Sequence, residues 1–501
     1  MKYCCCKTQS NNHTGTDTNL IIFTGTDYIC PMNKKELLFL QIANSIEHQI
    51  KNNVLKVGDK LASLRTIAFE KGVSINTVQQ AYFELERRGL VEARTKSGYY
   101  VIRQHKHFKE MPSGSNPIQV KSNSELADAY SAVYLENGLK GVNLVSTQLS
   151  PEFLPVSRLR KEIISASRSL PHAGILYDRF GNEKLKKQIA LRSLRWGGKL
   201  KSEDVLPTPG CLDAIALTLT ALLKPGDTIG VESPLHYGFI NITKNLGYKI
   251  LELPTHPTTG IDVEFLGKTL KQNKMDLLLL MANFSNPFGS YMPDENKKEV
   301  VRLIQKYDIP MIEDDIYSDL YFGNTAPGFC KTFDDSGSVI WCGSVSKTLA
   351  GGYRVGWMAP GKYKKQILNA KPHQSINCNS ITHEAIANFF ENNRYDNYLK
   401  KTRQVLYCNS LNFLHAINDY FPIDTKVTRP QGGIQLWVEL NKKTDTTELY
   451  NIAFANKINI APGRIFTNQN QFNNCLRLSY GMQWNAQIEN ALKLLGKLAS
   501  K

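Results

Sequence analysis

Short apolar runs that alternate with helical patterns constrain the fold of residues 125–501 more than any other feature of this chain. The runs are three to five residues long, a length that suits buried strands rather than helices. Buried strands separated by helices form mostly parallel sheets. The sequence therefore predicts an α/β fold here. The expected strands include Thr228–Val231, Leu277–Met281, Met311–Glu313 and Val339–Cys342.

A different pattern, three helices followed by a hairpin, fills residues 32–103. Apolar residues recur at helical steps in the first helix, and the glycines Gly72 and Gly89 close the next two. Two short strands then flank a basic hairpin tip. These are the parts of a winged helix-turn-helix, a DNA-binding fold. The expected helices span 35–50, 63–71 and 75–88, and the expected strands span 90–93 and 99–102.

Two segments carry no periodic pattern. Residues 1–31 are polar and lack the apolar core of a signal peptide, which predicts a disordered tail or a start assigned too early. Residues 104–124 are rich in Lys, Pro, Ser, Gly and Asn, which predicts a flexible linker. The predicted order is a tail at 1–31, a DNA-binding domain at 32–103, the linker at 104–124 and the large domain at 125–501.

The formal net charge of +16 is compatible with a nucleic-acid partner but does not locate it. Residues 32–103 hold 12 Lys and Arg against 7 Asp and Glu, so they carry only +5 of the excess. A generally basic soluble protein explains the charge equally well. No apolar run approaches the roughly 18 residues of a membrane span. Scattered cysteines without metal-ligand spacing predict reduced thiols, a cytoplasmic protein and no metal site, and the cluster Cys4–Cys6 has no assigned role.

The run GSVSKTL at 343–349 combines Lys347 with hydroxyl side chains in a short turn. A lysine that condenses with an aldehyde needs a rigid turn beneath it. Small hydroxyls and a nearby cation can hold a phosphate of the same cofactor, and Arg354 follows seven residues after Lys347. Pyridoxal 5′-phosphate carries both the aldehyde and the phosphate, so this spacing predicts that cofactor.

Residues 37–102 resemble the winged helix domain of the GntR family almost from end to end. The matching segments are LLFLQIANSIEHQI, VGDKLASLRTIA, VSINTVQQAYFELERRGLVEA and KSGYYV, in that order. The resemblance implies binding to double-stranded operator DNA through helix starts and the wing. Ile75 stands where the family often has Arg, so the operator sequence does not carry over, and Ser63 and Ser74 are expected N-caps as well. The residues expected at the DNA are Ser63, Arg65, Ser74, Asn76, Thr77, Arg94 and Lys96.

Residues 140–499 are similar to the class I aminotransferases, which implies the type I fold of pyridoxal-phosphate enzymes. Lys347 matches the Schiff-base lysine, the one catalytic residue expected. Asp314, in EDDIY, would pair with the pyridine nitrogen and keep it protonated, so that the ring acts as an electron sink. Tyr317 and Asn286, the latter in NFSNPFG, would hydrogen-bond the phenolate oxygen of the ring.

The same resemblance implies a phosphate site and a carboxylate site. The phosphate would lie at the N-terminus of a helix that begins near Cys211 and Leu212, with Ser344 and Arg354 beside it. Arg477, in CLRLSYG, matches the arginine that binds a substrate carboxylate.

Three further features bear on assembly and turnover. Tyr177 matches a position that commonly reaches the cofactor phosphate of the partner subunit, which implies a homodimer. His236 falls where the family usually stacks a Tyr on the cofactor ring, and imidazole offers less stacking area. Cys211 and Leu212 replace a more polar pair. The last two departures argue against efficient turnover while leaving cofactor binding in place.

A GntR-type domain, a linker and an aminotransferase-like domain, in this order, resemble the MocR regulators. The resemblance implies a cytoplasmic regulator that senses pyridoxal 5′-phosphate, or its aldimine with a small amine or amino-acid effector, and that reads an operator. The alternative is an active aminotransferase that carries a DNA-binding module, because the motifs suffice for half-reactions. A third hypothesis, a mere dimer scaffold, would need an empty site, and Lys347, Asp314 and Arg354 argue against it.

Overall fold

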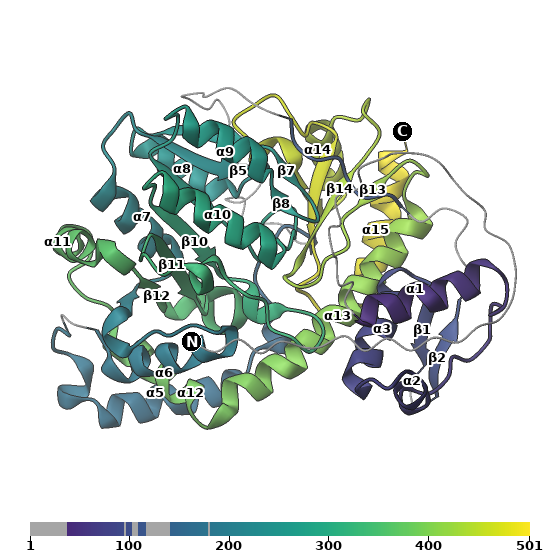
Figure 1. Cartoon of the computed structure of the whole chain (residues 1–501), viewed down its shortest axis with the longest axis horizontal. Coiled ribbons are helices and arrows are strands. Elements are labelled where there is room, and N and C mark those ends of the chain that lie inside the picture. Colours follow the sequence, from purple (N-terminus) through teal and green to yellow (C-terminus); the bar gives the residue numbers. More distant parts are fainter. Residues whose placement is uncertain (1–37, 95–96, 103–108, 117–140, 179–180, 501) are drawn as a thin grey trace, which may run out of the picture.

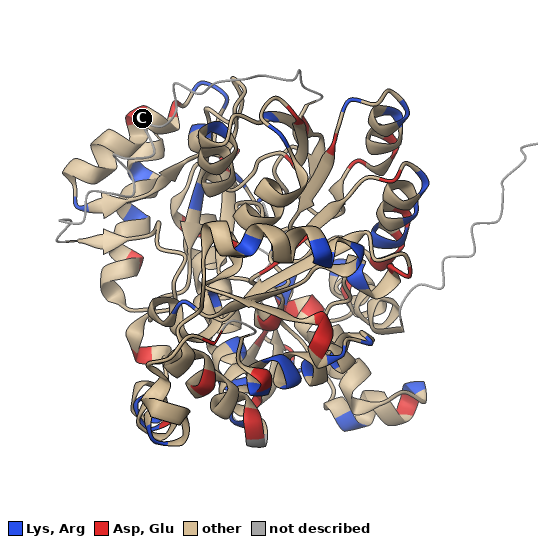
Figure 2. Ribbon diagram, turned by 90° about the vertical axis from the view of Figure 1, so that its left-hand side faces the viewer, with Lys and Arg blue, Asp and Glu red and all other residues tan. Residues whose placement is uncertain are grey.

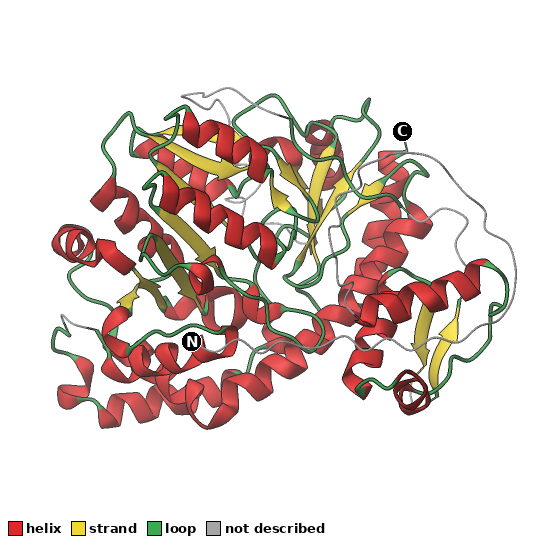
Figure 3. Ribbon diagram, viewed as in Figure 1, coloured by secondary structure: helices red, strands yellow, loops and turns green. Residues whose placement is uncertain are grey.

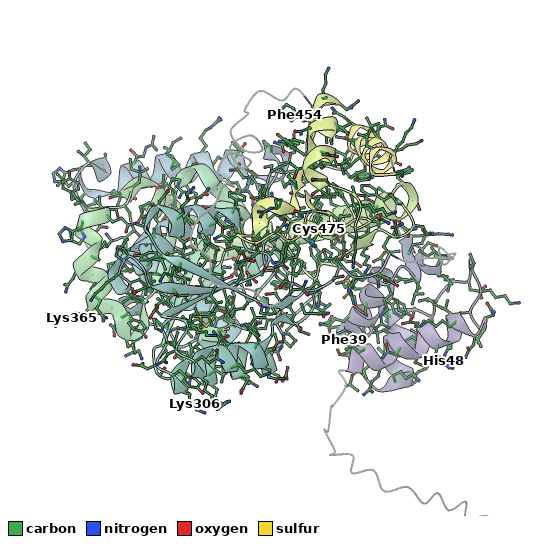
Figure 4. All side chains as sticks on the ribbon, turned by 90° about the horizontal axis from the view of Figure 1, so that it is seen from above. Phe39, His48, Lys306, Lys365, Phe454 and Cys475 are labelled. Atoms are coloured by element: carbon green, nitrogen blue, oxygen red, sulfur yellow. The ribbon has the colours of Figure 1, made fainter. Side chains whose placement is uncertain are left out.

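The computed structural model describes residues 38–94, 97–102, 109–116, 141–178 and 181–500. A small module of helices and a hairpin lies at one end of the molecule, beside a large α/β body (Figure 1). Figure 4, seen from above, labels Phe39 and His48 on the module and Lys365 at the opposite end of the body. Within these residues, no helix has the length and apolar character needed to cross a membrane.

The small module is a winged helix-turn-helix, as the sequence predicts. Ser63 accepts a hydrogen bond from Thr66 N at 3.1 Å and Ser74 one from Thr77 N at 3.1 Å, so both serines cap helices. Gly72 ends the second helix with a φ of 63°, a left-handed conformation that favours glycine. The elements are α1 (Leu38–Lys51), α2 (Leu64–Lys71), α3 (Ile75–Arg87), β1 (Val91–Arg94) and β2 (Gly98–Val101).

The wing differs slightly from its prediction. Strand β1 lies one residue later than predicted, and β2 lies one residue earlier. The reason is that the last antiparallel pair joins Arg94 to Gly98, one step beyond Ala93 and Tyr99. Helix α3 ends at Arg87, one residue earlier than predicted. These shifts leave the order of the elements unchanged, so the module retains the predicted fold.

A seven-stranded sheet forms the centre of the large body (Figure 3). Two neighbouring pairings at one edge of the sheet are antiparallel, and the remaining pairings are parallel. This confirms the predicted mostly parallel sheet. In spatial order the strands are β4 (Leu206–Thr208), β12 (Gly356–Ala359), β11 (Val339–Ser344), β10 (Met311–Asp315), β9 (Leu277–Leu280), β5 (Thr228–Glu232) and β6 (Lys249–Leu253).

Helices cover both faces of this sheet, and alternate strand residues enter separate cores. Leu277 and Leu279 belong to the core on one face, whereas Leu278 and Leu280 belong to the core on the other face. The helices of this body are α5 (Val156–Ser169), α6 (Glu183–Ser193), α7 (Cys211–Leu222), α8 (Tyr237–Asn245), α9 (Val263–Lys271), α10 (Asp294–Lys306), α11 (Lys364–Gln374) and α12 (Ser380–Phe390).

The long helix α13 (Arg394–Tyr420) connects the sheet region to the C-terminal part of the body, where it packs on α15 (Ala486–Ala499). A four-stranded sheet lies there, next to α14 (Thr446–Ala455). Its strands are β13 (Lys426–Val427), β14 (Gln435–Glu439), β17 (Cys475–Ser479) and β16 (Ala461–Pro462). Two small pairs complete the body: β3 (Val142–Asn143) with β15 (Ile458–Asn459), and β7 (Thr255–His256) with β8 (Gly260–Ile261).

Part of the predicted linker is fixed to the body. Lys109 is 4% exposed, and its ammonium donates to the carbonyl oxygen of Phe421 at 3.2 Å, beyond the end of α13. Ser113 N donates to Glu439 at 2.6 Å, and Val427 N donates to the carbonyl of Glu110 at 2.8 Å. Residues 109–116 are therefore not a flexible chain, which corrects the prediction. The remaining linker residues, the predicted tail and the start of the large domain at 125–140 lie outside the described residues.

Candidate functional site

Lys347 lies on a short π-helix (Ser346–Ala350) that directly follows β11. Its ammonium nitrogen donates to Thr147 Oγ1 at 2.8 Å. Burial lowers the pKa of Lys347 to about 8, and the charges of Arg477 and Arg354 act in the same direction. About one tenth of this amine is therefore neutral at pH 7, and the neutral amine is the form that attacks a carbonyl.

Asp314 lies at the end of β10 on the same face of the sheet as Cys211. The Cys211 thiol donates to Asp314 Oδ1 at 3.2 Å. Burial raises the pKa of Asp314 to about 7, although Cys211 and the nearby charge of Lys347 both lower it. Asp315 points to the opposite face and accepts from Trp341 Nε1 at 3.0 Å. The alternation of the strand thus directs only the first of the two neighbouring carboxyls toward Lys347.

Arg477, on β17, joins two other candidate residues. It is 0% exposed, and its Nη1 donates to Asn286 Oδ1 at 2.8 Å. The amide of Asn286 contacts the Tyr317 hydroxyl at 3.5 Å. Residues from three separate strands and loops therefore form one polar network beside Lys347, whose charge interaction with Arg477 lowers the lysine pKa.

A cradle of donors lies at the N-terminus of α7. Gly210 precedes the helix with a φ of 135°, and a Cβ there would lie 2.6 Å from Arg354 Nη2. Arg354 forms an ion pair with Asp213 at 2.9 Å. Ser344 is paired with Gly356 across β11 and β12, and Gly356 packs against the backbone of Gly210. Backbone N–H groups and a guanidinium thus lie together at the start of α7, and the Ser344 hydroxyl, which donates to Ser346 Oγ at 2.6 Å, lies two strands from β4 in the same sheet. Together with Lys347 these groups fit the phosphate and aldehyde of pyridoxal 5′-phosphate.

Three candidate residues have other surroundings. Tyr177 is 71% exposed, and Leu212 is 41% exposed. His236 caps α8 by accepting from Gly238 N at 3.2 Å. Burial, with the charges of Lys347 and Arg477, holds the pKa of His236 well below its usual range, so its ring is neutral beside the site.

Thr147 was missed by the sequence analysis. It lies in the segment NLVSTQLS, which contains no motif that would single it out. The backbone places it, because Ser479 N donates to Leu144 O at 2.8 Å and Ser150 N donates to Gly481 O at 2.8 Å. The Val145 carbonyl in the same segment accepts from Arg477 at 2.6 Å. This segment therefore connects β17 to Lys347 within the site.

The residues predicted to contact DNA occupy the free ends of α2, α3 and the wing. The side chains of Ser63, Arg65, Ser74 and Asn76 are exposed, and Thr77 is half-buried beneath Ser74. The exposed Arg94 guanidinium lies 4.3 Å from the centre of the Tyr100 ring. Lys96 lies outside the described residues. Charge gives little further guidance on the body, where Lys and Arg are interspersed with Asp and Glu over the face shown in Figure 2.

The chain matches two protein families. Residues 142–495 match the family described as aminotransferase class I and II, and residues 38–101 match the bacterial regulatory proteins of the gntR family. The uncharacterized HTH-type transcriptional regulator YjiR of Escherichia coli (strain K12) is 33% identical over 464 residues, which cover 92% of this chain and 98% of YjiR. The HTH-type transcriptional regulator NorG of Staphylococcus aureus is 26% identical over 448 residues, which cover 86% of this chain and 98% of NorG.

Solved structures of aminotransferases share the fold of the large body. The α-aminoadipate aminotransferase LysN of Thermus thermophilus, in complex with N-(5′-phosphopyridoxyl)-L-leucine, has a TM-score of 0.68 and 25% identity, and the match covers 75% of this chain and 97% of LysN. The multiple substrate aminotransferase of Thermococcus profundus has a TM-score of 0.69 and 24% identity over 75% of this chain and 97% of that chain.

Proposed function

Because the chain belongs to the class I and II aminotransferase family and carries an N-terminal GntR domain, the MocR architecture, we propose that it regulates transcription in response to pyridoxal 5′-phosphate. It is a transcriptional regulator with a DNA-binding domain and an aminotransferase-like domain. We further propose that the signal is the cofactor, alone or joined to a small amine or amino acid. A protein that binds chromosomal DNA would act in the cytoplasm.

The observation that carries the proposal is the intact site around Lys347. When bound, the cofactor would supply an aldehyde for an amine and a ring that draws electrons from it. Lys347 would hold it covalently, since the lowered pKa leaves its amine partly neutral. Asp314 would hold a proton on the ring nitrogen. The N-terminus of α7, Ser344 and Arg354 would bind the phosphate, and Arg477 would bind the carboxylate of an amino-acid effector.

Packing between the site and the DNA-binding module supports a regulatory link. The Phe83 ring of α3 lies 5.3 Å from the Tyr407 ring of α13, and Tyr407 lies 5.5 Å from Phe322. Phe322 lies 6.4 Å from Tyr480. Tyr480 follows Arg477 by three residues, and Phe322 follows Tyr317 by five. A ligand that shifts either segment would therefore shift the surface on which α3 rests.

A homodimer would complete this arrangement. Tyr177 is exposed and makes its proposed cofactor contact only if it reaches the site of a second subunit. The neighbouring side chains Ile175 and Leu176 are 83% and 62% exposed, which leaves apolar surface for a partner subunit to cover. Two linked DNA-binding modules would bind paired half-sites more tightly than one module alone.

An active aminotransferase remains the second candidate. The reactive state of Lys347 and the buried Arg477 favour it, because both are groups that a transamination half-reaction requires. Steady formation of a keto acid from an amino donor, with many turnovers per chain, would support the enzyme. A single stoichiometric conversion would support the sensor.

The regulatory proposal is tested by operator titration. A duplex selected from a random library by the full-length protein is titrated with and without pyridoxal 5′-phosphate and L-alanine. We expect the ligands to change the affinity of the parent protein. Lys347→Ala should abolish the effect of both ligands and the cofactor adduct that borohydride fixes on the chain, while basal DNA binding persists.

Arg477→Ala should retain the effect of the cofactor and lose that of the amino acid, and its cofactor absorbance reports whether the site is intact. An operator affinity that is insensitive to both ligands in the parent protein would contradict the proposal.

A further inference from the structure

A second cavity lies beside the short π-helix that carries Lys347, and Thr348 of that helix lines it. It is about 670 Å³ in volume, including space open to solvent, and it lies between α6, the ends of β10 and β11, and α13. Asp315, which lines the cavity, points away from Asp314 along β10. Ser344, which we propose to bind the cofactor phosphate, also lines the cavity, so the cavity adjoins the cofactor site. The lining residues that matter here are Asp315, Trp196, Trp341, Trp357, Tyr321 and Arg403.

Two polar atoms on the wall of this cavity lack partners. Asp315 Oδ1 and Trp357 Nε1 are both inaccessible to solvent, and neither has a hydrogen-bond partner among the described residues. Trp357 as a whole is 7% exposed. The other carboxylate oxygen of Asp315 accepts from Trp341 Nε1 at 3.0 Å. Buried polar atoms are almost always satisfied, so these two indicate that a ligand or water completes the site.

Arg403 supplies a positive charge without a carboxylate. Its Nη1 donates to the backbone oxygen of Asp319 at 3.4 Å, and its guanidinium lies 4.0 Å from the centre of the Tyr321 ring. The other two arginines of the cavity differ: Arg192 pairs with Asp319 and Asp396, and Arg195 pairs with Asp396. Among the residues that the structure describes, no carboxylate lies within ion-pair distance of Arg403. Its remaining N–H groups can therefore bind an anion.

The chemistry of the wall selects the ligand. An anion alone would leave Oδ1 of Asp315 without a partner, and a simple amine would leave the remaining N–H groups of Arg403 without an acceptor. Trp196, Trp341 and Tyr321 add aromatic surface that favours an organic cation over a hydrated metal ion. We propose that this cavity is a second ligand site that binds a small zwitterionic amino acid, with its carboxylate at Arg403 and its ammonium group at Asp315.

The cavity also adjoins the DNA-binding module. Arg403 lies one helical turn before Tyr407 on α13, and Tyr407 contacts α3. The segment that contains Tyr321 continues to Thr325, whose hydroxyl accepts from the Gln80 side chain of α3 at 3.3 Å. A ligand at this site therefore lies next to two of the contacts that hold the recognition helix.

Tryptophan fluorescence of the full-length protein tests this site directly, because three tryptophans line it. Titration with L-alanine should change the emission, and acetate and ethylamine, each carrying one of the two charges, should bind at least ten-fold more weakly. Arg403→Gln and Asp315→Asn should each weaken L-alanine binding at least ten-fold while leaving the cofactor absorbance unchanged. Arg302→Gln, a surface arginine that pairs with Glu299, is the matched control and should bind as the parent does.

The variants also separate the two sites. Arg477→Ala should retain the fluorescence response even if it loses the response of the cofactor absorbance. Parent-like binding of L-alanine by both Arg403→Gln and Asp315→Asn would overturn the proposal. The proposal would also fail if Arg477→Ala abolished the fluorescence response to L-alanine and the other two variants retained it. Acetate that binds as tightly as L-alanine would show an anion site and overturn the amino-acid assignment.

Discussion

The phenol of Tyr407 donates a hydrogen bond of 2.8 Å to Glu86 Oε2 and so joins helix α13 to recognition helix α3. Glu86 also accepts from Ala93 N at 3.0 Å, which fixes the start of the wing to the same carboxylate. Burial raises the pKa of Glu86, because the charged carboxylate loses contact with water. The hydrogen bonds from Tyr407 and Ala93 offset part of this cost. One side-chain pair therefore connects the body, the recognition helix and the wing.

Tyr407→Phe should weaken this connection without removing the ring contacts to Phe83 and Phe322. Loss of one hydrogen bond to a part-buried carboxylate should lower the free energy of unfolding by about 1–3 kcal/mol, measured by denaturant unfolding. The operator affinity should also respond less to cofactor, since the ligand-dependent shift is transmitted less well. Tyr420→Phe is the control, because its hydroxyl bonds Glu489 at 3.0 Å on the same helix but away from α3. Equal ligand responses in the two variants would contradict the role of Tyr407.

Capture of pyridoxal 5′-phosphate should depend on pH through Lys347. The pKa of about 8 means that the ammonium form predominates below pH 8 and the neutral amine above it. Since only the neutral amine attacks, the rate should rise by about ten-fold per pH unit below pH 8 and level off above it. Stopped-flow absorbance from pH 6.5 to 9.5 measures this rate. A rate that still climbs at pH 9.5 would indicate an ordinary, unshifted lysine.

Asp314→Asn should weaken cofactor binding at least ten-fold and change the absorption spectrum, because an amide does not hold a proton on the ring nitrogen. Equilibrium dialysis gives the affinity, and the absorption spectrum is recorded on the same samples. Asp315→Asn, one residue further along β10 and on the opposite face, should bind cofactor as the parent does. If both variants behave alike, the distinction drawn between the two carboxyls is wrong.

Arg65→Ala should weaken binding to specific and unrelated duplexes by a similar factor, as the loss of a phosphate contact does. The dependence of log affinity on log salt concentration should become shallower by about one. Fluorescence anisotropy at several salt concentrations measures both quantities. A change confined to which base is preferred would show that Arg65 contacts bases instead.

Local sequence was sufficient for the elements whose cause is local. Ser63 and Ser74 cap the helices that they were predicted to begin, and Gly72 ends its helix, because capping depends on residues three or four apart. The buried strands were predicted in the same way from short apolar runs, because such runs are too short for buried helices and suit buried strands. The order of the two domains also follows directly from the order of their motifs in the sequence.

The site could be predicted only in part. Motif resemblance singled out Lys347, Asp314 and Arg477, which lie within one network, but their roles stay predictions. Thr147 gave no signal, since its contact with Lys347 spans 200 residues of sequence and depends on how two strands meet. The linker was predicted as flexible from composition, which does not reveal that Lys109 finds carbonyl acceptors at the end of α13.

The sequence by itself determined most helices and strands and the two-domain order, because these depend on side-chain type and short-range spacing. It also predicted which residues would bind pyridoxal 5′-phosphate and DNA. The tertiary structure alone decided which face of the sheet each carboxyl of the Asp314–Asp315 pair enters, and which residues of α13 meet α3. Both outcomes depend on strand register and on the packing of segments hundreds of residues apart. A short-range sequence pattern does not predict such contacts. The free energy that stabilises them arises only when the distant surfaces are buried against each other.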